Sequence, residues 1–490
     1  MSKTEWHERK QESRFNSTLS TDPEQTLLQL RELFGNSVDL QFTSLRIGIA
    51  SGIVCTLTTM ADTKTMAEKL LLPLTEEMTA EAGSITRDQL EQLRQERLGV
   101  LPFVYATTLL EAVERLLTGD ALLIADGVDQ VLCIEIGGMA VRSLEEAKTQ
   151  RVNRGSDDAF TEAIETNLSL IRRRLRNPLL RVETFTAGAE TGTQIYLVYL
   201  DNAAKPSLVS TFRSRLSNVR IKGVFDSGNI KDAIKDKGSW FFPTILDVER
   251  PDTAASMLVG GSCLVFVNGS PFVLVGPAVY GQFFISAGDY YFPSLLSTAL
   301  RILRHFAFMV SLYLPAYYLC VINYHAEMIP TSLLYSISGQ EQGSPFPTGF
   351  MLIAMSLVFE VLREAGARVP RNIGQAVPLA GAIILGQAAV EAGIVSSIIL
   401  IIVAASELCG LVVPHFEFSA SVRLIRFGFM LAGLTLGIYG VFLGTAVLVI
   451  HLVNLNSFGI PYLTPFAPFR LKGQQDMLVR TSHISKGSSK

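Results

Sequence analysis

The sequence predicts a soluble α/β or α+β region of two subdomains, followed by an α-helical transmembrane bundle of about four to six membrane segments. In the first half, short apolar runs of strand and helix type alternate, and charged residues are frequent. In the last third, apolar stretches approach the length that a bilayer requires. In the second half, Lys237 and Lys472 bracket a stretch without any lysine. The first half of the chain therefore suits water, and the apolar stretches of the last third suit a lipid bilayer.

The composition narrows the class of protein further. Hydrophobic residues make up 48% of the 490 residues and the mean hydropathy is +0.33, which is high for a soluble protein. The net charge of −3 offers no basic face for nucleic acid. Five dispersed cysteines without CxxC spacing suit a reducing compartment. The polar start of the chain lacks the apolar region of a signal peptide, so we expect the soluble half to be cytoplasmic.

Residues 1–21 are expected to be a flexible N-terminus, and residues 22–141 to form the first α/β subdomain. Its first helix would begin with Asp22 as the cap and Pro23 at the first helical position. Strand-like and helical runs then alternate, and an Asp-Gly pair between two apolar runs predicts a hairpin near the end of this subdomain.

A polar linker, 142–156, precedes a second α/β subdomain at 157–252. A long amphipathic helix opens this subdomain, and strands and helices alternate after it. The loop at 187–192 (AGAETG) resembles a phosphate-binding loop, but it lacks both GxxxxGK[ST] and GxGxxG. Nucleotide binding is therefore not expected.

Residues 253–293 are expected to form a connector, either a hairpin or a re-entrant element. Within it, Leu258–Val279 is uncharged and long enough to span a bilayer. Glycine and proline pairs interrupt this run, and it contains an Asn-Gly step between β-rich segments. Because that step is a hairpin signal, a strand pair or re-entrant element is favoured over a spanning helix.

The transmembrane domain is predicted at 294–465, followed by a basic tail at 466–490. Its apolar spans are expected at 306–323, 347–362, 376–390, 392–414 and 427–452. The second and third spans are short, so either could be a half-helix or a re-entrant segment.

Basic residues predict the orientation, because cytoplasmic loops are enriched in Lys and Arg. Arginines precede the first span, follow the second and precede the last, whereas 324–346 has none. This distribution places the soluble half inside and 324–346 outside. The basic tail favours the inside, yet five crossings would put it outside. Either one span count is wrong, or Leu258–Val279 crosses, or one short segment is re-entrant.

Three glutamates lie in or beside these apolar spans: Glu360, Glu391 and Glu407. Ionisable groups in lipid are costly and usually face a bundle interior, a partner or a water path. Glu360 is one helical turn from Arg363 and Glu364, so it can pair with Arg363, inside a pathway or simply at the membrane boundary.

A polar track is a further expectation for this part of the chain. Gln387 is one turn before Glu391, and both could join Ser396, Ser397 and Glu407 in such a track.

Four glycines in the last span, Gly433, Gly437, Gly440 and Gly444, are predicted to share one helical face. Small residues at this spacing allow close helix packing, within one chain or between subunits around a pore. Catalysis is not expected, because the six histidines lack metal-ligand spacing and there is no GxSxG motif. We therefore assign no catalytic residue, cofactor or metal.

Several ordered motifs in this chain resemble the A subunit of GerA-type spore germination receptors. The matching segments are FTEAIETNLSLIRRRL (160–175), VERPD (248–252), NGSPFVL (268–274), DYY (289–291), IPTSLL (329–334), PFP (345–347), the block from VLREAGARVPRNIGQAV to VSS (361–397) and SFGIPYLTP (457–465). The chain departs from the family at Met351 and Ser356, where members often carry acidic residues, and at Asn268, where Asp is common. Glu360 is retained.

The resemblance implies a membrane subunit of a nutrient receptor in the inner membrane of the dormant endospore. It also implies a permease-like B subunit and a lipoprotein C subunit as partners, and a homo-oligomer that forms a nutrient-gated ion channel. The alternatives are a germination amplifier like stage V sporulation protein AF, which shares the membrane motifs, a secondary transporter, or a scaffold whose soluble half docks a partner.

Overall fold

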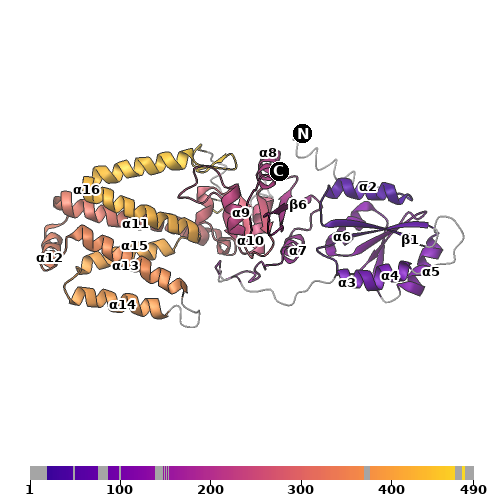
Figure 1. The fold of residues 1–490 in the computed structure, drawn as a ribbon, viewed down its shortest axis with the longest axis horizontal. Coiled ribbons are helices and arrows are strands. Elements are labelled where there is room, and N and C mark those ends of the chain that lie inside the picture. Colours follow the sequence, from indigo (N-terminus) through magenta and orange to yellow (C-terminus); the bar gives the residue numbers. More distant parts are fainter. Residues whose placement is uncertain are drawn as a thin grey trace. The chain divides into compact units, whose positions relative to one another are not determined.

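The computed structural model of this chain divides into two compact units. The first, here the α/β unit, comprises Met1–Lys235 and Ile245–Pro277, and the second, the helical unit, comprises Asp236–Thr244 and Ala278–Lys490 (Figure 1). The structure describes residues 19–47, 50–75, 86–98, 101–137, 147, 149–150, 152, 154–368, 376–469 and 477–480. Most of the expected flexible N-terminus and basic tail lies outside the described residues.

The first subdomain of the α/β unit is built on a five-stranded antiparallel sheet with the order β1-β2-β4-β5-β3. Its strands are β1 (Leu40–Ile47), β2 (Ala50–Leu57), β3 (Phe103–Ala106), β4 (Ala121–Ala125) and β5 (Val131–Ile134). Its helices are α2 (Pro23–Phe34), α3 (Thr63–Thr65), which continues through a π-helical turn (Met66–Leu71) into α4 (Leu72–Thr75), α5 (Arg87–Arg97) and α6 (Leu109–Thr118).

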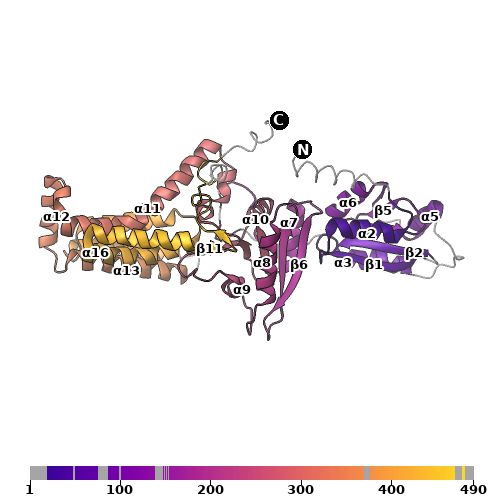
Figure 2. The ribbon, with the colours of Figure 1, turned by 90° about the horizontal axis from the view of Figure 1, so that it is seen from above.

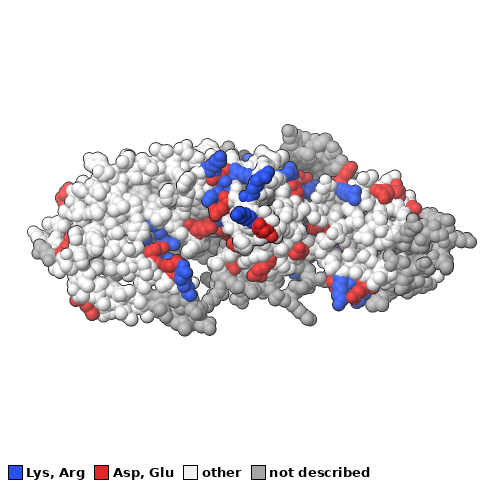
Figure 3. Space-filling view, in the orientation of Figure 1, with Lys and Arg blue, Asp and Glu red and all other residues white. Residues whose placement is uncertain are grey.

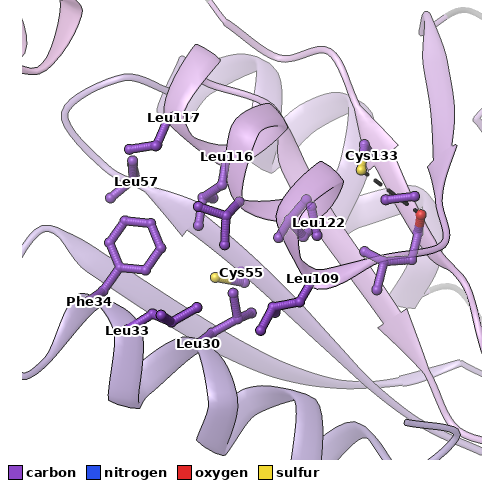
Figure 4. Close-up of a cluster of buried hydrophobic side chains, with 14 of the residues drawn as sticks. Leu30, Leu33, Phe34, Cys55, Leu57, Leu109, Leu116, Leu117, Leu122 and Cys133 are labelled. Carbon is purple, nitrogen blue, oxygen red and sulfur yellow. Dashed lines mark hydrogen bonds between the residues drawn. The ribbon is translucent and has the colours of Figure 1, made fainter. Parts of the chain in front are cut away.

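Both faces of this sheet are covered by helices. Neighbouring residues of a strand point to opposite faces and therefore belong to different clusters. Cys55 and Leu122 pack with α2 and α6 on one face, where Phe34 and Leu116 are fully buried (Figure 4). The adjacent residue Val54 joins a separate cluster on the other face. The buried strands therefore form the middle layer of a three-layer subdomain.

Local sequence signals explain where these helices begin and end. Asp22 caps α2 by accepting a hydrogen bond from the Glu24 backbone N–H at 3.0 Å. At α6, Thr108 and Glu111 form a reciprocal capping box. The helix ends at Gly119, whose φ of 106° is a left-handed conformation that suits glycine.

The second subdomain also contains a five-stranded antiparallel sheet, with the order β6-β7-β9-β10-β8. Its strands are β6 (Leu180–Ala187), β7 (Thr193–Leu200), β8 (Leu246–Val248), β9 (Cys263–Val267) and β10 (Val273–Gly276). Its helices are α7 (Ile164–Arg174), α8 (Pro206–Ser217), α9 (Ser227–Ile234) and α10 (Pro251–Val259).

The predicted connector at 253–293 is not a separate element. The structure contains the strand pair that we favoured for Leu258–Val279, but β9 and β10 lie between β7 and β8 as interior strands of the second sheet. Their residues are uncharged because both strands are completely buried. The predicted boundary at residue 252 is therefore too early, and the sheet continues to the end of β10.

A buried ion pair joins the two subdomains. Arg172 of α7 donates from Nε to Asp39 Oδ2 at 2.8 Å and from Nη2 to Asp39 Oδ1 at 3.0 Å. The Arg172 side chain is 0% exposed and the Asp39 side chain 2% exposed. Ser37 contributes a hydroxyl to the same guanidinium group. Because both charges are removed from water, each compensates the other, and the loss of either one would leave a buried charge without its partner.

The helical unit contains six α-helices and a short terminal hairpin among its described residues. The helices are α11 (Ser294–Tyr324), α12 (Thr331–Gln342), α13 (Thr348–Arg368), α14 (Ala376–Glu391), α15 (Ser397–Leu411) and α16 (Phe416–Asn454), and the hairpin strands are β11 (Asn456–Ser457) and β12 (Ile460–Pro461). By length and apolar composition, two described helices, α11 and α16, could each cross a membrane, and two shorter apolar helices accompany them.

Helix α16 folds back on itself at Gly437, which the single predicted span at 427–452 did not anticipate. Gly437 has φ 61° and ψ −144°, a region that only glycine occupies readily. A Cβ on Gly444 would lie 3.1 Å from the Phe429 ring, although these residues are fifteen positions apart in sequence. In a continuous helix that separation would be about 22 Å. The element is therefore two antiparallel arms that meet at Gly437 (Figure 1).

Candidate functional site

Five charged side chains meet inside the helical unit, and the face of this unit that Figure 3 shows is otherwise largely uncharged. Glu360 and Arg363 come from α13, Glu407 from α15, and Arg423 and Arg426 from the first arm of α16. We refer to these five residues as the ionic network. Glu360 and Arg363 are three residues apart on α13, and Arg423 and Arg426 are three residues apart on α16. One helical turn therefore brings the two members of each pair to the same face of their helix.

Arg363 links two carboxylates from different helices. Its guanidinium group bonds to Glu360 of the same helix and to Glu407 of α15. Glu407 also accepts a hydrogen bond from Arg426. Arg423 completes the network with its Nε 3.2 Å from Glu360 Oε2. Charged groups therefore join three helices, in addition to the apolar cluster that these helices share.

The network extends from the protein interior toward the surface. The side chains of Arg426 and Glu407 are 0% and 6% exposed, whereas that of Glu360 is 36% exposed. Two serine hydroxyls assist the arginines: Ser406 accepts from Arg426 Nη1 at 3.4 Å, and Ser419 accepts from Arg423 Nη1 at 3.2 Å.

Positive charge is in excess within the network, because three guanidinium groups face two carboxylates. The Arg426 Nε is buried without a hydrogen-bond partner among the described residues. Charges at this depth cost several kcal/mol unless they are fully paired. Since Arg363 is shared between two carboxylates, a small helix movement could change its partner while leaving each charge compensated.

The remaining predicted polar residues lie outside the network. Glu364 pairs with Arg368 on an exposed surface, where their side chains are 65% and 79% exposed. Gln387 donates to Glu391 at 2.8 Å, and both are exposed at the end of α14. Glu407 lies near the opposite end of α15 from Ser396 and Ser397, so the continuous polar track that we expected is not formed.

Two ends of the helical unit can be distinguished by their contacts. At one end, here the arginine end, the network joins the last turns of α13 and α15 to the start of α16. At the other, here the turn end, Tyr324 of α11 donates to the Leu434 carbonyl at 2.9 Å. Ser344, just before α13, donates to the Ile394 carbonyl at 2.9 Å, between α14 and α15. Consecutive helices therefore alternate in direction.

The four predicted glycines serve helix packing, but they do not share one face, because the backbone turns at Gly437. A Cβ on Gly433 would lie 2.8 Å from the Ala316 carbonyl oxygen of α11. A Cβ on Gly440 would lie 2.2 Å from the Ala432 oxygen, on the other arm of α16. Together with Gly444 against Phe429, these positions allow the arms of α16 to approach closely.

Sequence reasoning missed the two arginines that complete the network. Arg423 and Arg426 are the arginines that precede the last predicted span, and they served there only to predict orientation. Their three-residue spacing within an otherwise apolar helix was a signal that they need carboxylates from another helix. A second cluster, in which Asp289 binds Arg301 at 3.2 Å and Arg304 at 2.6 Å, was also missed.

Other reactive chemistry finds little support in the described part of the chain. It holds no group of three or more His, Cys, Asp or Glu residues that could bind a metal ion. In the first sheet, burial raises the pKa of the Cys133 thiol to about 12, which keeps it protonated and unreactive.

The fold and the network together define a class of protein. A two-sheet α/β unit is followed by a helical unit with long apolar helices and internally paired charges, which is consistent with a membrane-associated protein that carries a sizeable polar domain.

Comparison with known proteins gives the family. The family model described as Bacillus/Clostridium GerA spore germination protein matches residues 28–488. Spore germination protein KA of Bacillus subtilis (strain 168) is 37% identical over 457 residues, covering 93% of this chain and 83% of that protein. Spore germination protein A1 of the same organism is 34% identical over 421 residues, covering 86% of each chain. The chain belongs to the GerA family of spore germination proteins.

A solved structure also matches part of this chain. The crystal structure of the N-terminal domain of the A subunit of the Bacillus megaterium spore germinant receptor GerK3 is 28% identical, with a TM-score of 0.43. The match covers 54% of this chain and 98% of that one.

Proposed function

We propose that this chain is the A-type subunit of a germinant receptor that detects nutrients and triggers endospore germination. Its helical unit would form a nutrient-gated ion channel as a homo-oligomer, together with a permease-like B subunit and a lipoprotein C subunit. Membership of the GerA family and the names of the relatives support the role in germination. The observation that carries the channel mechanism is the ionic network buried among α13, α15 and α16.

The network suits a gate because its contacts can be exchanged. Arg363 already contacts carboxylates on two helices, and Arg426 and Arg423 hold the same two carboxylates from a third. A shift of α13 against α15 would transfer Arg363 from Glu407 to Glu360 without leaving either carboxylate unpaired. The charged groups rearranged in this way would line a polar path through apolar helices.

The proposal includes six membrane crossings by α11, α13, α14, α15 and the two arms of α16. Alternating helix directions support this number, as does the fold-back at Gly437. With six crossings the tail returns to the side of the membrane on which α11 begins. This removes the conflict between the basic tail, which favours the inside, and an odd number of spans. We place the α/β unit on the spore-core side of the inner membrane.

The test is ion flux from liposomes that contain the chain together with its B-type and C-type partners. Amino acids, sugars and nucleosides would be screened as triggers. We expect flux that requires a nutrient and all three subunits, and we expect Glu407→Gln to reduce it strongly. The control variant Glu364→Gln changes an exposed glutamate on the same helix as Glu360 and should leave flux unchanged. A stable complex that shows no flux with any nutrient would contradict the channel mechanism and favour a scaffold or signal-relay role.

A further inference from the structure

The beginning of α11, residues 294–306, has its polarity reversed relative to a helix of a water-soluble protein: apolar side chains face outward and polar side chains are buried. One face of this segment is apolar and exposed, and its members recur at intervals of three and four residues. We call this face the apolar stripe, formed by Leu295, Leu296, Ala299, Ile302, Leu303 and Phe306. Leu295 is 83% exposed and Phe306 64% exposed, so the stripe is not covered by the described residues.

The opposite face of the same segment is polar and buried. Ser297 and Arg301 are both 0% exposed. Ser297 Oγ donates to the Asp289 carbonyl at 2.6 Å, and Arg301 Nε donates to Asp289 Oδ2 at 3.2 Å. Arg304 adds two hydrogen bonds to the same carboxylate, at 2.6 Å and 2.9 Å. These polar groups therefore bond within the protein, while the apolar groups point outward.

The length of α11 places this segment at the edge of a bilayer. The helix has 31 residues, which corresponds to about 46 Å, whereas the hydrocarbon core of a bilayer is about 30 Å thick. About ten residues therefore extend beyond the core, and the beginning of α11 stands apart from the other long helices (Figure 2). Pro315 interrupts the hydrogen-bond ladder within the helix and allows its two parts to differ in direction.

We propose that the apolar stripe lies in the interfacial region of the lipid bilayer, so that α11 begins as an interfacial helix and continues as a spanning helix. Lipid is favoured over water because burying a large apolar side chain contributes about 1.5–3 kcal/mol, and the stripe has five of them. Lipid is favoured over a protein partner because the stripe continues into the part of α11 that is long and apolar enough to cross a membrane, and in this respect the inference rests on the proposed function.

The arrangement would attach the turn before α11 to the membrane surface. Asp289 lies in a 3₁₀ turn, Ala287–Tyr290, and its carboxylate holds two arginines from the polar face of the segment. A displacement of this turn would consequently move the stripe within the lipid interface. The inference concerns how α11 meets lipid, and it does not require the helical unit to conduct ions.

Site-directed spin labelling of the full chain in liposomes tests the proposal. Single cysteines would replace Leu295, Ile302 and Phe306, in a Cys409→Ala background because the other four native cysteines are buried. The collision rates of each label with oxygen, which enters lipid, and with a water-soluble nickel complex would be measured. At all three positions we expect the oxygen-to-nickel ratio to be several-fold higher than at an aqueous control.

Two reference positions make the outcome decisive. Phe225→Cys, 82% exposed in the α/β unit, is the aqueous control, and Phe442→Cys, 77% exposed on α16, is the lipid reference. High nickel accessibility along the stripe would place it in water and overturn the proposal. Low accessibility to both reagents would show that protein covers the stripe, which overturns it as well. If one variant does not fold, Ala299→Cys provides another position on the same face.

Discussion

Arg426 carries a fully buried guanidinium group among apolar helices, and its partner Glu407 comes from a different helix. At the scale of single residues, the stability of the helical unit should depend on such pairs more than on any exposed charge. Two charges that have both left water stabilise each other, whereas one that loses its partner remains as an uncompensated charge.

Glu407→Gln should therefore destabilise the helical unit by about 3–5 kcal/mol, because it leaves the buried Arg426 without its carboxylate and leaves Arg363 with Glu360 alone. The measurement is the unfolding temperature of the detergent-solubilised chain. The matched control is Glu364→Gln, whose pair with Arg368 is exposed and is expected to contribute less than about 1 kcal/mol. Equal unfolding temperatures for the two variants would show that the network adds no stability.

A residue-scale pH dependence is expected in the α/β unit. Burial raises the pKa of Asp120 to about 6 from its ordinary value of 3.8. The folded state therefore binds this proton more tightly than the unfolded state, and stability should fall as the pH rises from about 4 to about 6 and stay lower above that range. Asp120→Asn imitates the neutral carboxyl group and should flatten this part of the profile.

The pH prediction is checked by thermal melts of the α/β unit within the full chain, followed by circular dichroism over that pH range. Asp129→Asn, at an exposed position of the same subdomain, is the control and should keep the wild-type slope. A slope that is unchanged in Asp120→Asn would assign the pH dependence to other groups.

At the scale of elements, the decisive feature is the reversal of α16 at Gly437. The two arms of α16 contact each other through Gly440 and Gly444, so the turn and the packing depend on the same small residues. An apolar sequence of this length would otherwise continue as one helix, because no proline interrupts it.

Gly437→Ala should disturb the reversal and destabilise the helical unit by about 1–3 kcal/mol, because its backbone conformation is strained for any other residue. The added Cβ would also lie 3.0 Å from the Tyr324 ring. Gly428→Ala is the control: it lies in the same helix, its Cβ would meet no atom within 4 Å, and it should be neutral or slightly stabilising. Thermal unfolding in detergent compares the two variants, and a Gly437→Ala chain as stable as wild type would contradict the prediction.

At the scale of the whole molecule, the proposed six crossings place both ends of the chain on the same side of the membrane. Ser336→Cys, exposed on α12 at the turn end, should react with a membrane-impermeant maleimide in intact cells that express the chain. Ser207→Cys, exposed on α8 of the α/β unit, should react only after permeabilisation.

A reporter fused to the C-terminus should give the same result as Ser207→Cys if the number of crossings is even. Labelling of the C-terminal reporter from outside would mean an odd number, and the proposed topology would then be incorrect. The Gly437 reversal would remain in that case, but at least one of the two short apolar helices would not cross.

The sequence by itself determined those features that depend on near neighbours. Asp22 at a helix start and the Asn-Gly step at a hairpin were recognisable because capping and turn formation involve residues only a few positions apart. The Glu360–Arg363 pair was predictable for the same reason, since one helical turn brings the two side chains together.

Only the tertiary structure decided which distant groups meet. Arg426 and Glu407 are brought together by the packing of α15 against α16, and their separation in sequence carries no periodic signal of that contact. The strands β9 and β10 join the second sheet because β7 and β8 provide free edges there. Gly437 reverses the chain in a backbone conformation that glycine adopts readily, and the two arms then contact each other at Gly440 and Gly444. Local hydrogen bonding decides whether a segment forms a helix or a strand. Burial and charge pairing decide which elements pack together, and these contacts exist only in the folded chain.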